Sequence, residues 1–338
     1  MTKDIISTLE TLLKINSPTG YTIEVIKYIE DLFKNDEKLF VKKTNKGSLS
    51  VSFSETPGLM ISGHIDTLGA MVKEINSDGT IAITQLGSYP LNSFEGEYVT
   101  VRNSAGKLFR GTLLLNNPAD HVNRKVRTQD RNTNTMSVRP DMLKSGKKDF
   151  YGINPGDFIF YDTRFEYTDS GFIKSRFLDD KACAAIMIEL IKDMCKSKLK
   201  NKNTGFYFSN YEEVGHGSCV GFPDSVTELL VLDMAVIGEG CAGKEDAVSI
   251  CAKDSSGPYD FHVTNKLRKL AEKKKLNFVI DIYPYYGSDG SAALRAGYDF
   301  RVGLIGPGVS ASHGVERTHR KALEETYKLT KAYIDNFS

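Results

Sequence analysis

Histidines and carboxylates that could hold metal ions stand at scattered turns along this chain. They are His64 and Asp66 in GHID, Asp179 in RFLDDK, Glu212 and Glu213 in YEEVG, Asp233 in VLDM and His313 in ASHGVE. Two neutral imidazoles and several carboxylates form a mixed nitrogen and oxygen ligand set. Such a set suits zinc, cobalt or manganese better than magnesium, which prefers oxygen alone. The residue types therefore indicate metal-assisted chemistry, provided that the fold brings them together.

Each of these pieces also has a structural explanation when it is taken alone. An HxD pair is more often structural than catalytic, and an EE pair usually lies on a solvated surface. Asp179 and Asp180 could cap the helix that follows them, because the helix dipole favours acids at its N-terminus. Asp233 could be a turn residue and His313 a hydrogen-bonded buried histidine. The argument for a site therefore depends on the whole set.

Composition limits the classes of protein to which the chain can belong. Its 338 residues include 44 Lys and Arg against 43 Asp and Glu, and 40% are hydrophobic. A packed core is therefore expected, and a protein built around a nucleic-acid or membrane-surface charge field is excluded. No apolar run approaches the roughly 18 residues of a membrane span, and the N-terminus reads as an amphipathic helix. We expect a soluble cytoplasmic protein with no nucleic-acid or membrane partner.

The five cysteines all lie between Cys183 and Cys251 and form no CxxC pair. An odd number without finger spacing argues against a disulfide framework and against a cysteine zinc site. Reduced thiols are therefore the expectation.

Helical and strand-like patterns alternate in the two outer parts of the chain. The expected helices cover 5–13, 23–33, 180–195, 259–274 and 317–336, and the expected strands cover 39–41, 48–53, 59–61, 204–209, 228–232, 247–252 and 302–305. This alternation predicts a sheet with helices on both faces, that is, a three-layer α/β/α domain. Open α/β sheets gather ligands at the carboxyl ends of their strands, so residues distant in sequence can converge there.

The pattern changes in the middle of the chain. Between residues 68 and 165 the apolar runs alternate with polar residues or are rich in β-formers, and turn signals separate them. No long helix intervenes, which predicts an inserted all-β, barrel-like domain of about 100 residues. We therefore assign 1–67 and 166–338 to one α/β domain and 68–165 to the insertion. The polar stretch 120–135 is expected to be a loop.

The order His, Asp, Glu-Glu, Asp, His resembles that of co-catalytic dinuclear metallopeptidases. The chain is similar to the glutamyl aminopeptidases of clan MH, which include the tetrahedral (TET) aminopeptidases, in SGHIDTLGAMV, SRFLDDKACA, YEEVGHGS, VLDMAVIGEG, YYGSDGSAALRAG and SHGVERTH. These segments run in order from residue 62 to 319, and a β-module follows the first, as in that family. The resemblance implies a metallopeptidase domain interrupted by a dimerisation barrel. It also implies a homo-oligomer, a dodecamer built from dimers.

The resemblance further implies two divalent metal ions per subunit, which would be zinc, cobalt or manganese. Asp179 matches the aspartate that bridges them. His64 and Asp233 would complete one metal site, and Glu213 and His313 the other. Two such ions about 3.5–4 Å apart can share a water and lower its pKa toward about 7.

Two further carboxylates receive catalytic roles from the resemblance. Glu212 matches the general base, which takes the proton of the metal-bound water and hands it to the leaving amine. Asp66 lies two residues after His64 and would hydrogen-bond its imidazole, fixing the tautomer. The expected activity is the removal of N-terminal residues from short peptides.

The chain departs from the family at positions that bear on specificity. Thr67 stands where the family usually has an acid, Lys181 where it has arginine, and Cys183 where glycine is common. None of these changes removes a metal ligand, but Thr67 could change the substrate pocket. A metal-dependent amidase or deacylase acting on N-acyl amino acids or dipeptides is therefore the alternative. A non-catalytic scaffold is a third hypothesis, against which the complete set of ligands and the base argue.

Overall fold

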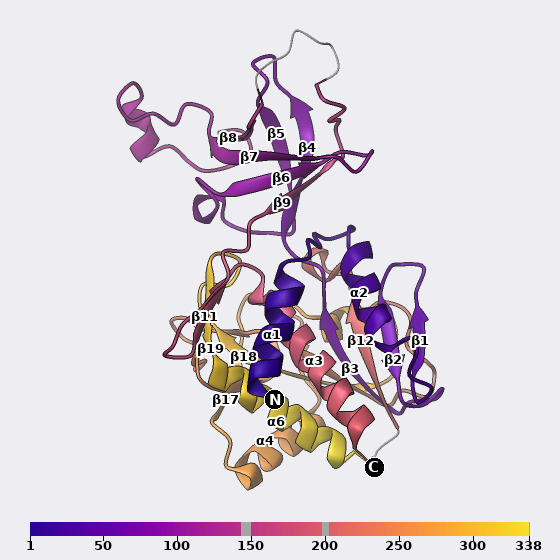
Figure 1. The fold of residues 1–338 in the computed structure, drawn as a ribbon. Coiled ribbons are helices and arrows are strands. Elements are labelled where there is room, and N and C mark those ends of the chain that lie inside the picture. The colour runs from indigo at the N-terminus through magenta and orange to yellow at the C-terminus, as the bar shows by residue number, and fades with distance from the viewer. Residues whose placement is uncertain (143–149, 198–202, 338) are drawn as a thin grey trace.

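The computed structural model describes residues 1–142, 150–197 and 203–337. Figure 1 shows a small barrel that stands on one side of a larger α/β domain, with both chain ends in the larger domain. The predicted α/β fold with an inserted barrel is confirmed. No helix in the described ranges is long and apolar enough to span a membrane.

The larger domain is built on a sheet in which ten strands are described. Along its main path lie β1 (Phe40–Lys43), β2 (Leu49–Ser52), β12 (Thr204–Ser209), β3 (Leu59–His64), β13 (Glu228–Leu232), β18 (Arg301–Val309), β15 (Val248–Asp254) and β16 (Gly257–Pro258), while β14 (Ala235–Val236) pairs with β18 and β17 (Phe278–Ile282) with β15. The central strands β12, β3, β13 and β18 run parallel. Their carboxyl ends therefore meet at one edge of the sheet.

Helices cover both faces of this sheet. They are α1 (Thr2–Leu13), α2 (Ile23–Phe33), α3 (Leu178–Lys196), α4 (Phe261–Lys274), α5 (Asp289–Arg295) and α6 (Arg320–Asp335). Alternate residues of β13 enter different hydrophobic clusters. Leu230 belongs to the cluster that includes buried residues of α1, α3 and α6, whereas Val231 belongs to the cluster that includes Ala293 of α5. Every residue from Leu178 to Ile191 is buried, as the apolar pattern of that helix predicted.

The insertion forms a closed barrel. Its strands are β4 (Gly69–Ile75), β5 (Ile81–Leu86), β8 (Met136–Pro140), β7 (Leu108–Leu115), β6 (Tyr98–Arg102) and β9 (Phe158–Tyr161), in order around the barrel. Alternate residues such as Val99 and Val101 are fully buried inside it, which is the period-two pattern of a strand with one apolar face. All barrel strands lie inside the predicted insertion, whose exact limits stay a prediction.

The structure corrects one helix boundary and adds short elements. Residues Glu316–His319 form β19, which pairs with β11 (Phe172–Ser175), and β11 also pairs with β10 (Glu166–Tyr167). The last helix therefore begins at Arg320 and not at residue 317, because the ladder to β11 competes for those residues. Three 3₁₀ turns, η1 (Leu91–Ser93), η2 (Arg124–Arg127) and η3 (Glu212–Val214), were not predicted. The five cysteines are free, as expected.

Candidate metal centre

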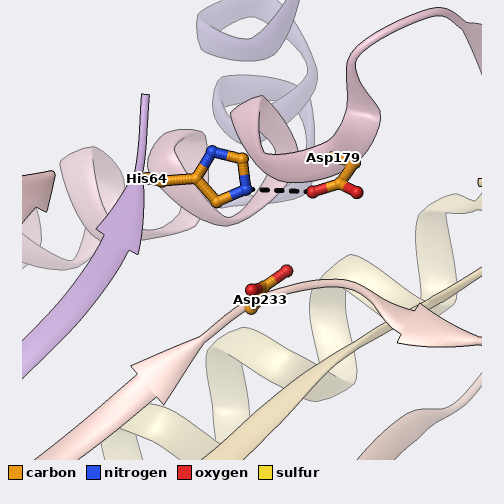
Figure 2. A group of neighbouring side chains, drawn as sticks. All are labelled: His64, Asp179 and Asp233. Atoms are coloured by element: carbon orange, nitrogen blue, oxygen red, sulfur yellow. Dashed lines mark hydrogen bonds and ion pairs between the residues drawn. The ribbon is translucent and has the colours of Figure 1, made fainter. Parts of the chain in front are cut away.

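Three of the predicted ligands meet at the carboxyl edge of the sheet. His64 is the last residue of β3, Asp233 follows β13, and Asp179 lies at the start of α3. Figure 2 shows their side chains directed toward a common space, with His64 Nε2 3.0 Å from one carboxylate oxygen of Asp179. One ligand atom from each residue lies within 4.8 Å of the others. This spacing is short enough for one cation to contact all three.

The other two predicted ligands lie on the opposite side of Asp179. Its second oxygen is 3.3 Å from His313 Nε2, and His313 Nε2 is 3.6 Å from Glu213 Oε2. Ligand atoms of Asp179, Glu213 and His313 also lie within 4.8 Å of one another. Asp179 therefore belongs to two groups and presents one carboxylate oxygen to the histidine of each.

Glu212 lies beside these groups in an open pocket. One of its carboxylate oxygens is 3.8 Å from His64 Nε2. The pocket has a volume of about 440 Å³, and its lining includes Asp179, Glu212, Glu213, Asp233 and His313. A small ligand that enters the pocket therefore meets both candidate metal groups and the predicted base.

Asp66 holds the glutamate pair rather than the imidazole. Its buried carboxylate accepts hydrogen bonds from the Thr19 hydroxyl at 2.7 Å and from the backbone N–H groups of Glu212 at 3.2 Å and Glu213 at 3.4 Å. The Nδ1–H of His64 donates to the backbone carbonyl of Asp66 at 2.8 Å, whereas the carboxylate is 3.8 Å away. The expected link to His64 therefore runs through the main chain, and it directs Nε2 toward Asp179.

Several residues of the site adopt left-handed backbone conformations that non-glycine residues rarely adopt. Phe177, Tyr211 and His313 have φ values of 65°, 75° and 61°. Each such conformation costs about 1–3 kcal/mol and persists only where the surroundings enforce it. Each of the three lies at or within two residues of a candidate ligand, so part of the backbone strain of the chain lies at the site.

Glu316 helps to enforce this geometry, a role that was not predicted from the sequence. Its buried carboxylate accepts hydrogen bonds from the backbone N–H of Asp179 and from that of His313, each at 3.1 Å. Burial, together with the charge of Asp179, raises the pKa of Glu316 to about 8. Its partners are backbone groups, which leave no trace in a pattern of side-chain types.

Burial and mutual repulsion change the acidity of the clustered carboxyl groups. Burial raises the pKa of Glu212 and of Glu213 well above the usual value, and burial and the charge of Asp179 raise the pKa of Asp233 to about 8. Burial opposes charge on Asp179 and His313 too, but their mutual hydrogen bond prevails. The pKa of Asp179 is therefore lowered and that of His313 is raised to about 10.

The residues present fit a pair of divalent cations. Four carboxyl groups, those of Asp179, Glu212, Glu213 and Asp233, surround only two imidazoles, so the cluster with all four deprotonated would hold more negative than positive charge. Buried polar atoms are normally hydrogen-bonded, yet Glu213 Oε1 and both carboxylate oxygens of Asp180 have no partner among the described residues. Cations would satisfy the excess charge and Glu213 Oε1. The nitrogen and oxygen donors suit zinc, cobalt or manganese.

Comparison with known proteins agrees with this reading. The family model for M42 glutamyl aminopeptidase matches residues 47–329. A putative aminopeptidase of Bacillus subtilis (strain 168), YhfE, is 43% identical over 337 residues, which are 97% of this chain and 96% of that protein. The chain belongs to the M42 glutamyl aminopeptidase family. It is thus a peptide hydrolase of the aminopeptidase type, and the resemblance found in the sequence is confirmed.

Solved structures share the fold of this M42 member at low sequence identity. The TET1 peptidase of Pyrococcus horikoshii superposes with a TM-score of 0.86 at 20% identity, over 98% of this chain and 100% of that one. The TET aminopeptidase of Thaumarchaeota archaeon SCGC AB-539-E09 gives 0.88 at 18% identity, over 99% and 98%. The barrel insertion and the α/β domain are therefore both part of a known architecture.

Proposed function

We propose that this M42 aminopeptidase is a dinuclear metal enzyme that removes N-terminal residues from short peptides. The observation that carries the proposal is the position of Asp179, which presents one oxygen to His64 and the other to His313. Asp179, His64 and Asp233 would hold one ion, and Asp179, Glu213 and His313 the other. The ions would be zinc, cobalt or manganese.

Such ions would supply Lewis acidity that polarises the scissile carbonyl group and acidifies the attacking water. Glu212 has the position of the general base. Its carboxylate borders the pocket, and Asp66 fixes its backbone. It would accept the proton of the attacking water and pass it to the leaving amine. Burial, which raises the pKa of Glu212, makes its protonated form available for that second transfer.

The pocket also suggests a preference for an acidic N-terminal residue. Arg295, the last residue of α5, lines the pocket, and no carboxylate pairs with it in the described part of the chain. Arg295 is exposed, and a glutamyl or aspartyl side chain in the pocket would pair with its guanidinium. The glutamyl specificity named in the family description agrees with this assignment.

We further propose a homo-oligomer in which barrels join subunits into dimers and six dimers form a dodecamer. The support is the Pyrococcus horikoshii relative, which assembles into a tetrahedron or a large octahedral shell. Light scattering coupled to size-exclusion chromatography should give the mass of twelve chains. A monomer at assay concentration would contradict this assembly.

A substrate-profile assay tests the proposed activity. Metal-free protein is reconstituted separately with zinc, cobalt and manganese, then offered aminoacyl p-nitroanilides and N-acetyl dipeptides. We expect turnover of free N-termini only, with glutamyl and aspartyl anilides preferred. Arg295→Met should weaken glutamyl turnover by about tenfold, the value of one charge-assisted hydrogen bond, and leave alanyl turnover unchanged. Activity confined to blocked substrates would replace the aminopeptidase by an amidase or deacylase.

A further inference from the structure

Residues 87–97, the connection between β5 and β6, bring the inserted barrel to the metal centre. The Nδ1–H of His313 donates to the backbone carbonyl of Ser88 at 2.5 Å. Gly87 precedes it, and a Cβ built there would lie 3.5 Å from Glu213 Cβ. The segment therefore accepts a hydrogen bond from one candidate ligand and passes close to another ligand of the same ion. The Nδ1–H of His64, by contrast, donates within the α/β domain, to Asp66.

A buried arginine ties this connection to the turn that carries His313. Arg176, which is 1% exposed, precedes α3 by two residues. Its guanidinium donates to the carbonyl of Ser93 at 2.7 Å, to the carboxylate of Glu97 at 2.8 Å and to the carbonyl of Gly314 at 3.1 Å. It also stacks 3.9 Å from the ring centre of Phe94. One planar group thus holds the barrel connection on one side and the residue after His313 on the other.

These contacts would fix the orientation of His313 as a metal ligand. The group that accepts the second ring N–H of a ligating histidine fixes its tautomer and orientation, and changes there typically cost 10–100-fold in metal affinity. For His313 that group is a carbonyl of the barrel, and the position of the carbonyl depends on the connection that Arg176 holds. Gly314 follows His313 directly. A shift of Gly314 or of the connection 87–97 would therefore displace the imidazole of His313.

We propose that Arg176 is a positioning residue: through the barrel connection 87–97 and Gly314 it sets the affinity of the Asp179, Glu213 and His313 group for its ion. The inference rests on the proposed dinuclear function. It assigns to the inserted domain a part in building the metal centre, in addition to any role in assembly. His64 takes its support from Asp66 instead, so the effect is expected on the Asp179, Glu213 and His313 group.

Arg176→Lys is the direct test, because it keeps a positive charge opposite buried Glu97 but cannot span Ser93 and Gly314. Arg164→Lys is the matched control. Arg164 also pairs with Glu97, at 3.0 Å, but its side chain is 53% exposed, and in the described residues it has no hydrogen bond to the His313 turn. Calorimetric titration of metal-stripped protein with zinc measures both sites, and cobalt absorption spectra report the geometry of each ion.

We expect Arg176→Lys to bind one ion as the parent does and the other about 10–100-fold more weakly, with a changed cobalt spectrum. Arg164→Lys should match the parent in both. A second variant guards against a folding defect in Arg176→Lys. The double change Arg176→Gln with Glu97→Gln removes both charges of this ion pair together and should show the same selective loss. Equal loss at both sites, or no loss in a variant with parental thermal unfolding, would overturn the inference. A parent chain that binds fewer than two ions would instead refute the proposed function.

Discussion

The metal centre has two halves, which share Asp179 and are constructed differently. The first half is completed by His64 and Asp233, and the second by Glu213 and His313. His64 and Asp233 stand at the ends of neighbouring parallel strands and are 1% and 4% exposed. Glu213 and His313 stand in a 3₁₀ turn and in a left-handed turn, and the His313 side chain is 34% exposed. The sheet itself fixes the first half. The second half needs support from buried carboxylates and from the barrel, so it should be the easier of the two to disturb.

Asp179 joins the halves, and its loss should have the largest effect. Asp179→Asn removes a charge that both ion positions share. We expect loss of both ions and a fall in the rate of hydrolysis of more than about 10⁴-fold. The Lewis acidity of the ions and the proton transfer from the water that they acidify would be lost together. Metal content after dialysis, measured beside anilide turnover, checks this. Retention of one tightly bound ion would mean that Asp179 does not bridge.

Glu212→Gln should separate chemistry from metal binding. The amide keeps the shape of the side chain but cannot accept the proton. Turnover should fall by about 10²–10⁴-fold, the usual contribution of general acid–base catalysis, while both halves keep their ions. Glu239→Gln, an exposed acid of the same type, is the control. Parental turnover in Glu212→Gln would reassign the base.

Asp66→Asn should act on the second half alone. The amide can still accept one backbone hydrogen bond, but its NH₂ faces the N–H of Glu212 or Glu213 or the Thr19 hydroxyl. His64 keeps its bond to the Asp66 main-chain carbonyl. We expect about 10–100-fold weaker binding of one ion in a zinc titration. Asp78→Asn, a turn carboxylate of the barrel that accepts a backbone N–H, is the control. Equal weakening of both ions would contradict the division into halves.

The smallest effect concerns pH. Burial raises the pKa of Asp233 from 3.8, and of Glu316 from 4.5, to about 8. Between these values the folded, metal-free chain binds more protons than the unfolded chain, so its stability falls as pH rises through this window. A cation bound at Asp233 removes the share of this penalty that comes from Asp233. The rise in melting temperature on adding zinc, measured against a chelator control, should therefore grow from about pH 5 to about pH 8. A rise independent of pH would show that Asp233 is not at an ion.

The ends of the central strands were the predictable part of the site. The sequence places His64 and Asp233 at the carboxyl ends of apolar strands, and residues at such ends converge at one edge of a parallel sheet. Glu316 and Arg176 could not be predicted, because most of their partners lie in segments distant in sequence and many of them are backbone carbonyl and N–H groups. The same reason explains the misplaced start of the last helix. Its helical pattern continues into β19, and only the ladder to β11 shows otherwise.

Anomalous diffraction from crystals of the zinc-loaded protein tests the central claim most directly. The account predicts two peaks per chain at the zinc edge, on either side of Asp179. One should lie among His64, Asp179 and Asp233 and the other among Asp179, Glu213 and His313. A single peak, or peaks away from these side chains, would contradict it.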